Sequence, residues 1–199
     1  MTRTTRRTFL LSASATALLS FAMPLQAMTE ARAKTLVDQV VSEINRVIAS
    51  GKSQNAMIRD FERIFARYAD VSIIARSALG QDSRRATPAQ LRSFTKAFQG
   101  YIARKYGKRF RDFIGGTVEV TGVRKVKSYH EVRSRVTLRG SAPFDVRFHV
   151  SSRSGRDLFF DMIIEGVSLR ITERTEMGAL LDQNGGNIDA LIATVSRTG

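Results

Sequence analysis

The feature that most constrains the fold is a change in hydrophobic period at Gly115 and Gly116. Before these glycines, apolar residues recur every three or four positions, and after them they alternate with polar residues. The first spacing places apolar side chains on one side of a helix, and the second places them on one face of a strand. Helices followed by strands favour an α+β fold over a parallel βαβ array. We therefore expect N-terminal helices packed on a curved antiparallel sheet of about four strands, followed by C-terminal helices.

Four helical segments are expected before the change: one at 30–49, one that begins after Ser53, one at 70–79 and a long fourth helix. The fourth has the strongest start signal, since Thr87-Pro88-Ala89-Gln90 suits a capping box with proline in the first turn. Its apolar face is unusually aromatic, and we expect this helix to lie across one face of the sheet. The members of that face are Leu91, Phe94, Phe98, Tyr101, Ile102, Tyr106, Phe110 and Phe113.

Strands are expected from Val118, at 131–139, at 144–150 and from 157 onward, with a hairpin turn at Ser154-Gly155. The last strand belongs to the stretch DLFFDMIIEGVSLRI, which is apolar on both faces, so both faces should be covered. The residues expected to face the helices, or a cavity beneath them, are Phe160, Met162 and Ile164. The residues expected on the opposite face are Phe159, Asp161 and Ile163. Beyond Gly166, the alternation of Val167, Leu169 and Ile171 predicts a resumed strand, followed by helices around 176–182 and 187–196.

The composition is that of one globular domain. The chain has 199 residues, 43% of them hydrophobic, which suffices for a single core across 28–199. It has no cysteine, and this excludes disulfides, thiolate zinc sites and a cysteine nucleophile.

The first 27 residues resemble a bacterial export signal. Thr5-Arg6-Arg7-Thr8-Phe9-Leu10 is a twin-arginine pattern, an apolar run extends to Ala22, and Leu25-Gln26-Ala27 suits cleavage. We therefore expect residues 1–27 to direct export to the periplasm by the twin-arginine route. Their removal takes away three arginines and no acid, so the formal charge falls by three, from +14 to +11. Such a charge favours polyanions, and export favours lipid head groups and anionic membranes over nucleic acid. An arginine-rich genome composition would explain the charge as well.

Catalytic motifs are scarce. His130 and His149 are the only histidines, and neither is spaced for metal binding, so we expect no metal and no cofactor. The best enzyme hypothesis takes Asp161 as a general base, because its apolar neighbours would raise its pKa. A solvent-exposed or arginine-paired Asp161 is the favoured alternative.

Two stretches together resemble one family. The first runs from Leu79-Gly80 through the Thr87–Gln90 segment to Tyr106, and the second is Phe160-Asp161-Met162-Ile163 with Glu165-Gly166-Val167-Ser168-Leu169. Over residues 35–195 the chain is similar to the MlaC family of periplasmic phospholipid-binding proteins. The resemblance implies an NTF2-like fold and a monomeric, non-enzymatic carrier with phospholipid acyl chains between sheet and helices. It also implies transfer between an outer-membrane lipoprotein complex and an inner-membrane ABC transporter with an MCE-domain ring. A hopanoid or other polycyclic lipid is the alternative ligand.

A lipid pocket needs apolar side chains facing a cavity, since each buried CH₂ contributes about 0.8 kcal/mol. The lining candidates are Val71, Ile74, Phe94, Phe98, Tyr101, Val136, Leu138, Phe148, Phe160, Met162 and Ile164. About half of them are expected only to fill the core. The candidates for contact with a head group or an anionic membrane are Arg104, Lys105, Lys108 and Arg109. A solvated helix face is the simpler interpretation of those four cations.

Overall fold

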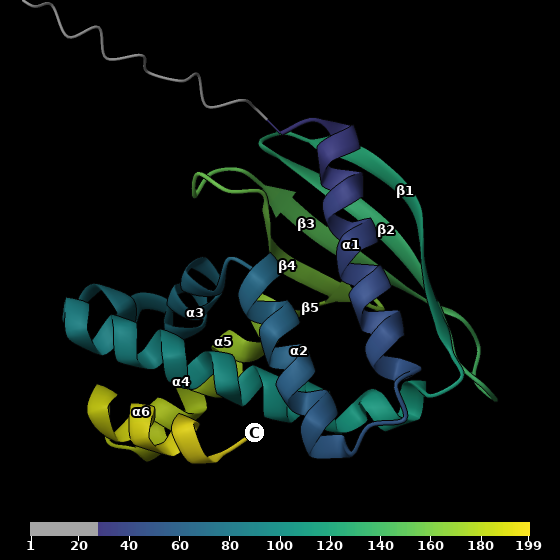
Figure 1. Cartoon of the computed structure of the whole chain (residues 1–199). Helices are drawn as coiled ribbons and strands as arrows, with labels where there is room; N and C mark the ends of the chain where they lie inside the picture. The colour runs from purple at the N-terminus through teal and green to yellow at the C-terminus, as the bar shows by residue number, and fades with distance from the viewer. Residues whose placement is uncertain (1–27) are drawn as a thin grey trace, which may run out of the picture.

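The computed structural model describes residues 28–199, and the expected export signal at 1–27 lies outside the described residues. Helices come first, an antiparallel sheet follows and two helices close the chain, so the α+β prediction is confirmed (Figure 1). The helical elements are α1 (Glu30–Ile48), α2 (Gln54–Tyr68), α3 (Val71–Leu79), η1 (Gly80–Arg84), α4 (Pro88–Gly107), η2 (Lys108–Phe113), α5 (Leu169–Gln183) and α6 (Ile188–Arg197). Within residues 28–199, none of these helices has both the length and the apolarity to cross a bilayer.

The sheet has five strands in the order of the sequence, and every neighbouring pair is antiparallel. They are β1 (Thr117–Val126), β2 (Tyr129–Thr137), β3 (Phe144–Ser151), β4 (Leu158–Ile164) and β5 (Val167–Ser168). Four strands were expected, and the fifth is the two-residue β5, which pairs with the end of β4.

The helix that covers the sheet is α1, and the prediction that the aromatic helix would do so is wrong. In Figure 1, α1 crosses β1, β2 and β3, whereas α4 runs below the sheet beside α6. The side chain of Asn45 joins α1 to the sheet through hydrogen bonds to the backbone of Val118, 3.0 and 3.2 Å long. Phe94, Phe98 and Tyr101 of α4 are buried among the helices, and the rings of Phe94 and Phe98 stack with centroids 5.8 Å apart. We call the surface of the sheet under α1 its inner face.

The capping box at the start of α4 is confirmed. Thr87 Oγ1 accepts a hydrogen bond from the Gln90 backbone N–H at 3.1 Å, and Gln90 Oε1 accepts one from the Thr87 N–H at 3.0 Å. Both bonds satisfy donors that a helix start leaves without partners.

A β-bulge lies where β3 pairs with β4. Phe148 opposes Met162 and His149 opposes Asp161, but Val150 opposes Phe159, so Phe160 is the extra residue. Phe159 therefore lies on the inner face, against Phe65 and Phe148, with its carbonyl accepting a hydrogen bond from the backbone N–H of Asp70. The alternation predicts Phe160 on the inner face and Phe159 on the outer face, and both predictions are wrong. Met162 and Ile164 lie on the inner face as expected, because the bulge precedes them.

The resumed strand expected through Leu169 and Ile171 is a helix start instead. The side chain of Ser168 caps α5 by accepting a hydrogen bond from the Ile171 N–H at 3.3 Å. Asp161 accepts from the Ser168 hydroxyl at 2.8 Å and from the Arg170 N–H at 3.2 Å. A carboxylate at a helix N-terminus stabilises its unpaired N–H groups, so α5 begins seven residues earlier than expected.

Candidate functional site

A cavity of about 350 Å³ lies between the inner face of the sheet and the helices. Strands β2, β3 and β4 supply six of its fifteen lining residues, and cross-strand pairs such as Val136 with Phe144 and Phe148 with Met162 stand side by side on that face. Apolar side chains predominate in the wall. The lining residues are Ile44, Phe61, Tyr106, Arg109, Asp112, Phe113, Val118, Val136, Leu138, Phe144, Val146, Phe148, Met162, Ile164 and Glu165.

The segment η2 closes one side of this cavity. Phe113 packs edge-to-face on Phe144 of β3, with ring centroids 6.4 Å apart. Glycines shape the turns at both ends of η2. A Cβ at Gly107 would lie 2.9 Å from the Ile58 side chain, and one at Gly116 would lie 2.6 Å from the Thr137 carbonyl oxygen. Only glycine permits these approaches, which hold η2 close to α2 and to β2.

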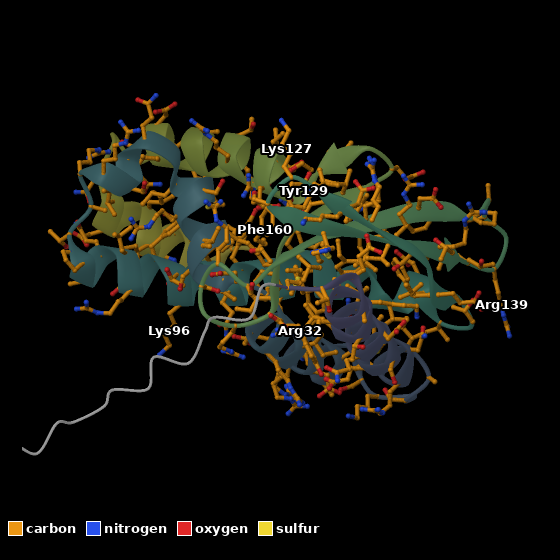
Figure 2. All side chains as sticks on the ribbon, turned by 90° about the horizontal axis from the view of Figure 1, so that it is seen from above. Arg32, Lys96, Lys127, Tyr129, Arg139 and Phe160 are labelled. Carbon is orange, nitrogen blue, oxygen red and sulfur yellow. The ribbon has the colours of Figure 1, made fainter. Side chains whose placement is uncertain are left out.

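Five of the eleven lining candidates line this cavity: Val136, Leu138, Phe148, Met162 and Ile164. The other six lie elsewhere. Five belong to α3 and α4 and are buried in the core among the helices, because α4 packs away from the sheet: Val71, Ile74, Phe94, Phe98 and Tyr101. Phe160 lies on the outer face of the sheet, against Tyr129 and His149 (Figure 2).

The four head-group candidates are also divided. Arg104 donates to the carbonyls of Val195 and Thr198 near the C-terminus, and Lys108 donates to the carbonyl of Gly199. Lys105 forms ion pairs with Glu173, at 2.8 Å, and with Glu176. Arg109 alone of the four lines the cavity, and no hydrogen bond or ion pair joins it to another residue in the described part of the chain.

A second hollow, of about 310 Å³, adjoins the cavity, and we call it the side groove. It is lined by Lys105, Tyr106, Arg109, Ile164, Val167, Leu169 and Thr172. Tyr106, Arg109 and Ile164 line both hollows, so the side groove and the cavity meet at these three residues. Neither Val167 nor Tyr106 is among the lining residues predicted from the sequence.

A buried cluster between α4 and α5 holds Tyr106 in place. The Tyr106 hydroxyl donates to Oε1 of Glu173 at 2.7 Å, and Glu173 is fully buried. Burial, followed by this hydrogen bond, raises the pKa of Tyr106 well above its usual range. Burial alone would lower the pKa of Lys105, but its bonds to Glu173 and Glu176 outweigh burial and raise it. Lys105 is therefore charged and committed to two carboxylates, which makes it a poor head-group ligand.

Asp161 does not face the cavity. It opposes His149 on the outer face and caps α5, so it is not placed as a base toward anything bound inside. His149 lies 3.6 Å from Glu131, and burial is the main cause that lowers its pKa. Within residues 28–199, no three His, Asp or Glu side chains are grouped to hold a metal ion.

Two comparisons place the chain among known proteins. The family model described as MlaC protein matches residues 34–197. The fold is similar to the structure of a phospholipid-binding protein from Ralstonia solanacearum in complex with a phospholipid. That similarity has a TM-score of 0.67 at 21% sequence identity and covers 83% of this chain and 93% of the other.

Proposed function

The chain belongs to the MlaC family, and from this premise we propose that the inner-face cavity holds the acyl chains of a bound phospholipid. Proteins of this family are periplasmic, non-enzymatic phospholipid carriers in the pathway that maintains outer-membrane lipid asymmetry, and this chain is one of them. The observation that carries the proposal is an apolar wall contributed by three adjacent strands, with Val136, Phe148 and Met162 at its centre. The similar protein from Ralstonia solanacearum, with its phospholipid, supports it.

The energetics of transfer favour such a cavity. A lipid that leaves a bilayer loses about 0.8 kcal/mol for each CH₂ exposed to water, and an apolar wall restores that contribution. No catalytic group is required for this function. The carboxylates in the lining, Asp112 and Glu165, belong to exposed residues.

We place the phosphate of the head group at Arg109. Its guanidinium is exposed and lies where the cavity meets the side groove. A guanidinium can bind phosphate oxygens with two parallel hydrogen bonds. The other three predicted cations have partners within the protein.

The proposed route of the lipid runs between an outer-membrane lipoprotein complex and an inner-membrane ABC transporter with an MCE-domain ring. Transient contact with an anionic membrane also suits the charge of +11, which is +14 less the three arginines of residues 1–27. Two apolar residues beside the side groove add to this surface, since Val167 is 61% exposed and Ile171 is 68% exposed.

Lipid extraction from the purified mature protein tests the proposal. We expect about one phospholipid per chain for the unmodified protein and for Ile73→Glu, a control that adds an acid at an exposed apolar residue of α3. Met162→Glu should carry little lipid, because a charge in an apolar cavity costs several kcal/mol. An unmodified protein that is free of lipid, and takes none from vesicles, would contradict the proposal. A hopanoid in the extract would replace phospholipid as the ligand.

The export route needs its own test. Replacing Arg6 and Arg7 together with lysine should leave the precursor in the cytoplasm if the twin-arginine route is used. Cell fractionation and immunoblotting measure this. Unchanged export of the double variant would indicate the general secretion route instead.

A further inference from the structure

The cavity is small for a lipid with two acyl chains. At about 350 Å³ it lies near the lower end of the ~300–1,000 Å³ range of ligand pockets. That space suits one acyl chain. A second chain needs further apolar space that is continuous with the first.

The side groove supplies such space. Its volume, about 310 Å³, is close to that of the cavity, and the two share Tyr106, Arg109 and Ile164. Leu169 contributes a buried apolar side chain to it, and Val167 contributes one of the most exposed large apolar side chains in the described part of the chain. A bound acyl chain would cover Val167 and remove this apolar surface from water.

Tyr106 divides the two hollows and is fixed in that position. Its hydroxyl is bonded to the buried carboxylate of Glu173, which Lys105 also binds. Because the ammonium of Lys105 is turned to Glu173 and Glu176, it adds no free charge to the side groove. Its carbon stem is then available as apolar wall.

We infer that the phospholipid binds with its acyl chains divided, one in the cavity and the other in the side groove, on either side of Tyr106. The glycerol and phosphate then lie where the hollows meet, beside Arg109. This inference rests on the proposed function and specifies a ligand with two chains. A single-chain lipid would use only the cavity.

Lipids with one and two chains test the division. The probes are vesicles of dioleoyl phosphatidylglycerol and micelles of oleoyl lysophosphatidylglycerol, and the readout is lipid bound to the purified mature protein. Val167→Glu should lower affinity for the two-chain lipid at least about tenfold, comparable to losing about two buried methylenes. It should leave affinity for the one-chain lipid within about twofold of the unmodified value.

The controls separate this inference from the proposed function. Met162→Glu, inside the cavity, should weaken both lipids, whereas Ile73→Glu should weaken neither. If Val167→Glu affects both lipids equally, or neither, the chains are not divided. If the unmodified protein binds neither lipid, the proposed function itself fails.

Photocrosslinking provides an independent readout. A phosphatidylglycerol with a diazirine in each acyl chain should label both the wall around Met162 and the groove around Val167, because each hollow then holds a labelled chain. Mass spectrometry of the digested protein locates the labels. Labels confined to the cavity wall would overturn the inference.

Discussion

The two faces of the sheet differ in character. Its inner face lines an apolar cavity beside Phe148, whereas on its outer face the intervening residues of the same strands form a network of charges. There, the carboxylate of Glu131 is 2.8 Å from Arg124, 3.3 Å from Arg133 and 3.6 Å from Arg147, although Glu131 itself is only 3% exposed. On the same face Tyr129 packs edge-to-face on Phe160, and both residues are labelled in Figure 2.

The difference concerns specificity of contact. Dispersion contacts on the inner face are nearly non-directional, so the wall tolerates a flexible chain of variable length. Ion pairs and hydrogen bonds on the outer face require fixed geometry, and they stabilise one register of β1, β2 and β3. The inner face can therefore accommodate different acyl chains, and the outer face preserves the shape of the sheet.

The largest difference in bound lipid is expected between two variants that place an acid on opposite faces of β4. Met162→Glu should remove nearly all bound lipid, whereas Phe160→Glu should retain it, because Phe160 lies outside the cavity. Lipid extracted per folded chain measures both. If Phe160→Glu were as lipid-free as Met162→Glu, the assignment of faces from the bulge would be incorrect.

Removing the central charge of the outer face is expected to reduce stability. Glu131→Gln leaves three partly exposed arginines without their shared carboxylate, and the loss of this partly screened network should cost about 2 kcal/mol. The melting temperature should fall by roughly 4–8 °C for a domain of this size. Calorimetry measures it, and lipid content should stay unchanged. A melting temperature within about a degree of the unmodified value would show that solvent screens the network completely.

Acidic pH should reduce the stability of the protein by protonating Glu131 on the outer face. The hydrogen bond from Arg124 is the main cause that lowers the pKa of Glu131 from 4.5 to about 2, against the opposing effect of burial. The folded-state pKa is below the unfolded one, so this stabilisation is full above pH 4.5 and is lost as pH falls toward 2. The loss should be on the order of 2 kcal/mol. Denaturant unfolding between pH 5 and 2 should be less pH-dependent for Glu131→Gln, and equal dependence would contradict this assignment.

The smallest effect is expected at Asp161. Asp161→Asn weakens the hydrogen bonds that begin α5, at a cost of about 1 kcal/mol, and should leave lipid content unchanged. Urea unfolding of the variant gives the stability change. A loss of bound lipid without a change in stability would place Asp161 in the binding site after all.

The elements predicted best from sequence are those determined by neighbouring residues. The capping box at 87–90 and the inward residues of β2 and β3 needed only local patterns, and both are found. Local patterns could not predict which helix packs on the sheet. An apolar stripe shows which side of a helix is buried but not against which element, so the aromatic α4 and the aliphatic α1 were equally eligible.

The remaining errors near the site come from contacts that local patterns do not show. No glycine or proline marks the bulge, which arises from pairing with β3 and from the bond between Phe159 and Asp70, which are distant in sequence. The start of α5 likewise depends on Asp161, seven residues before its cap. The ion pair that occupies Lys105 joins helices separated by about a third of the chain, beyond the reach of any local pattern.

The order of the strands has a consequence for how the protein folds. Because β1 through β5 pair only with their neighbours in sequence, the sheet can grow hairpin by hairpin, each closing a short loop. The distant encounters that remain join the helices to one another and to the sheet, as in the packing of α4 against α6, of α3 against α5 and of α1 on β1. The sheet is therefore expected to form quickly from its hairpins, before these helix contacts complete the fold, without assistance from the cargo.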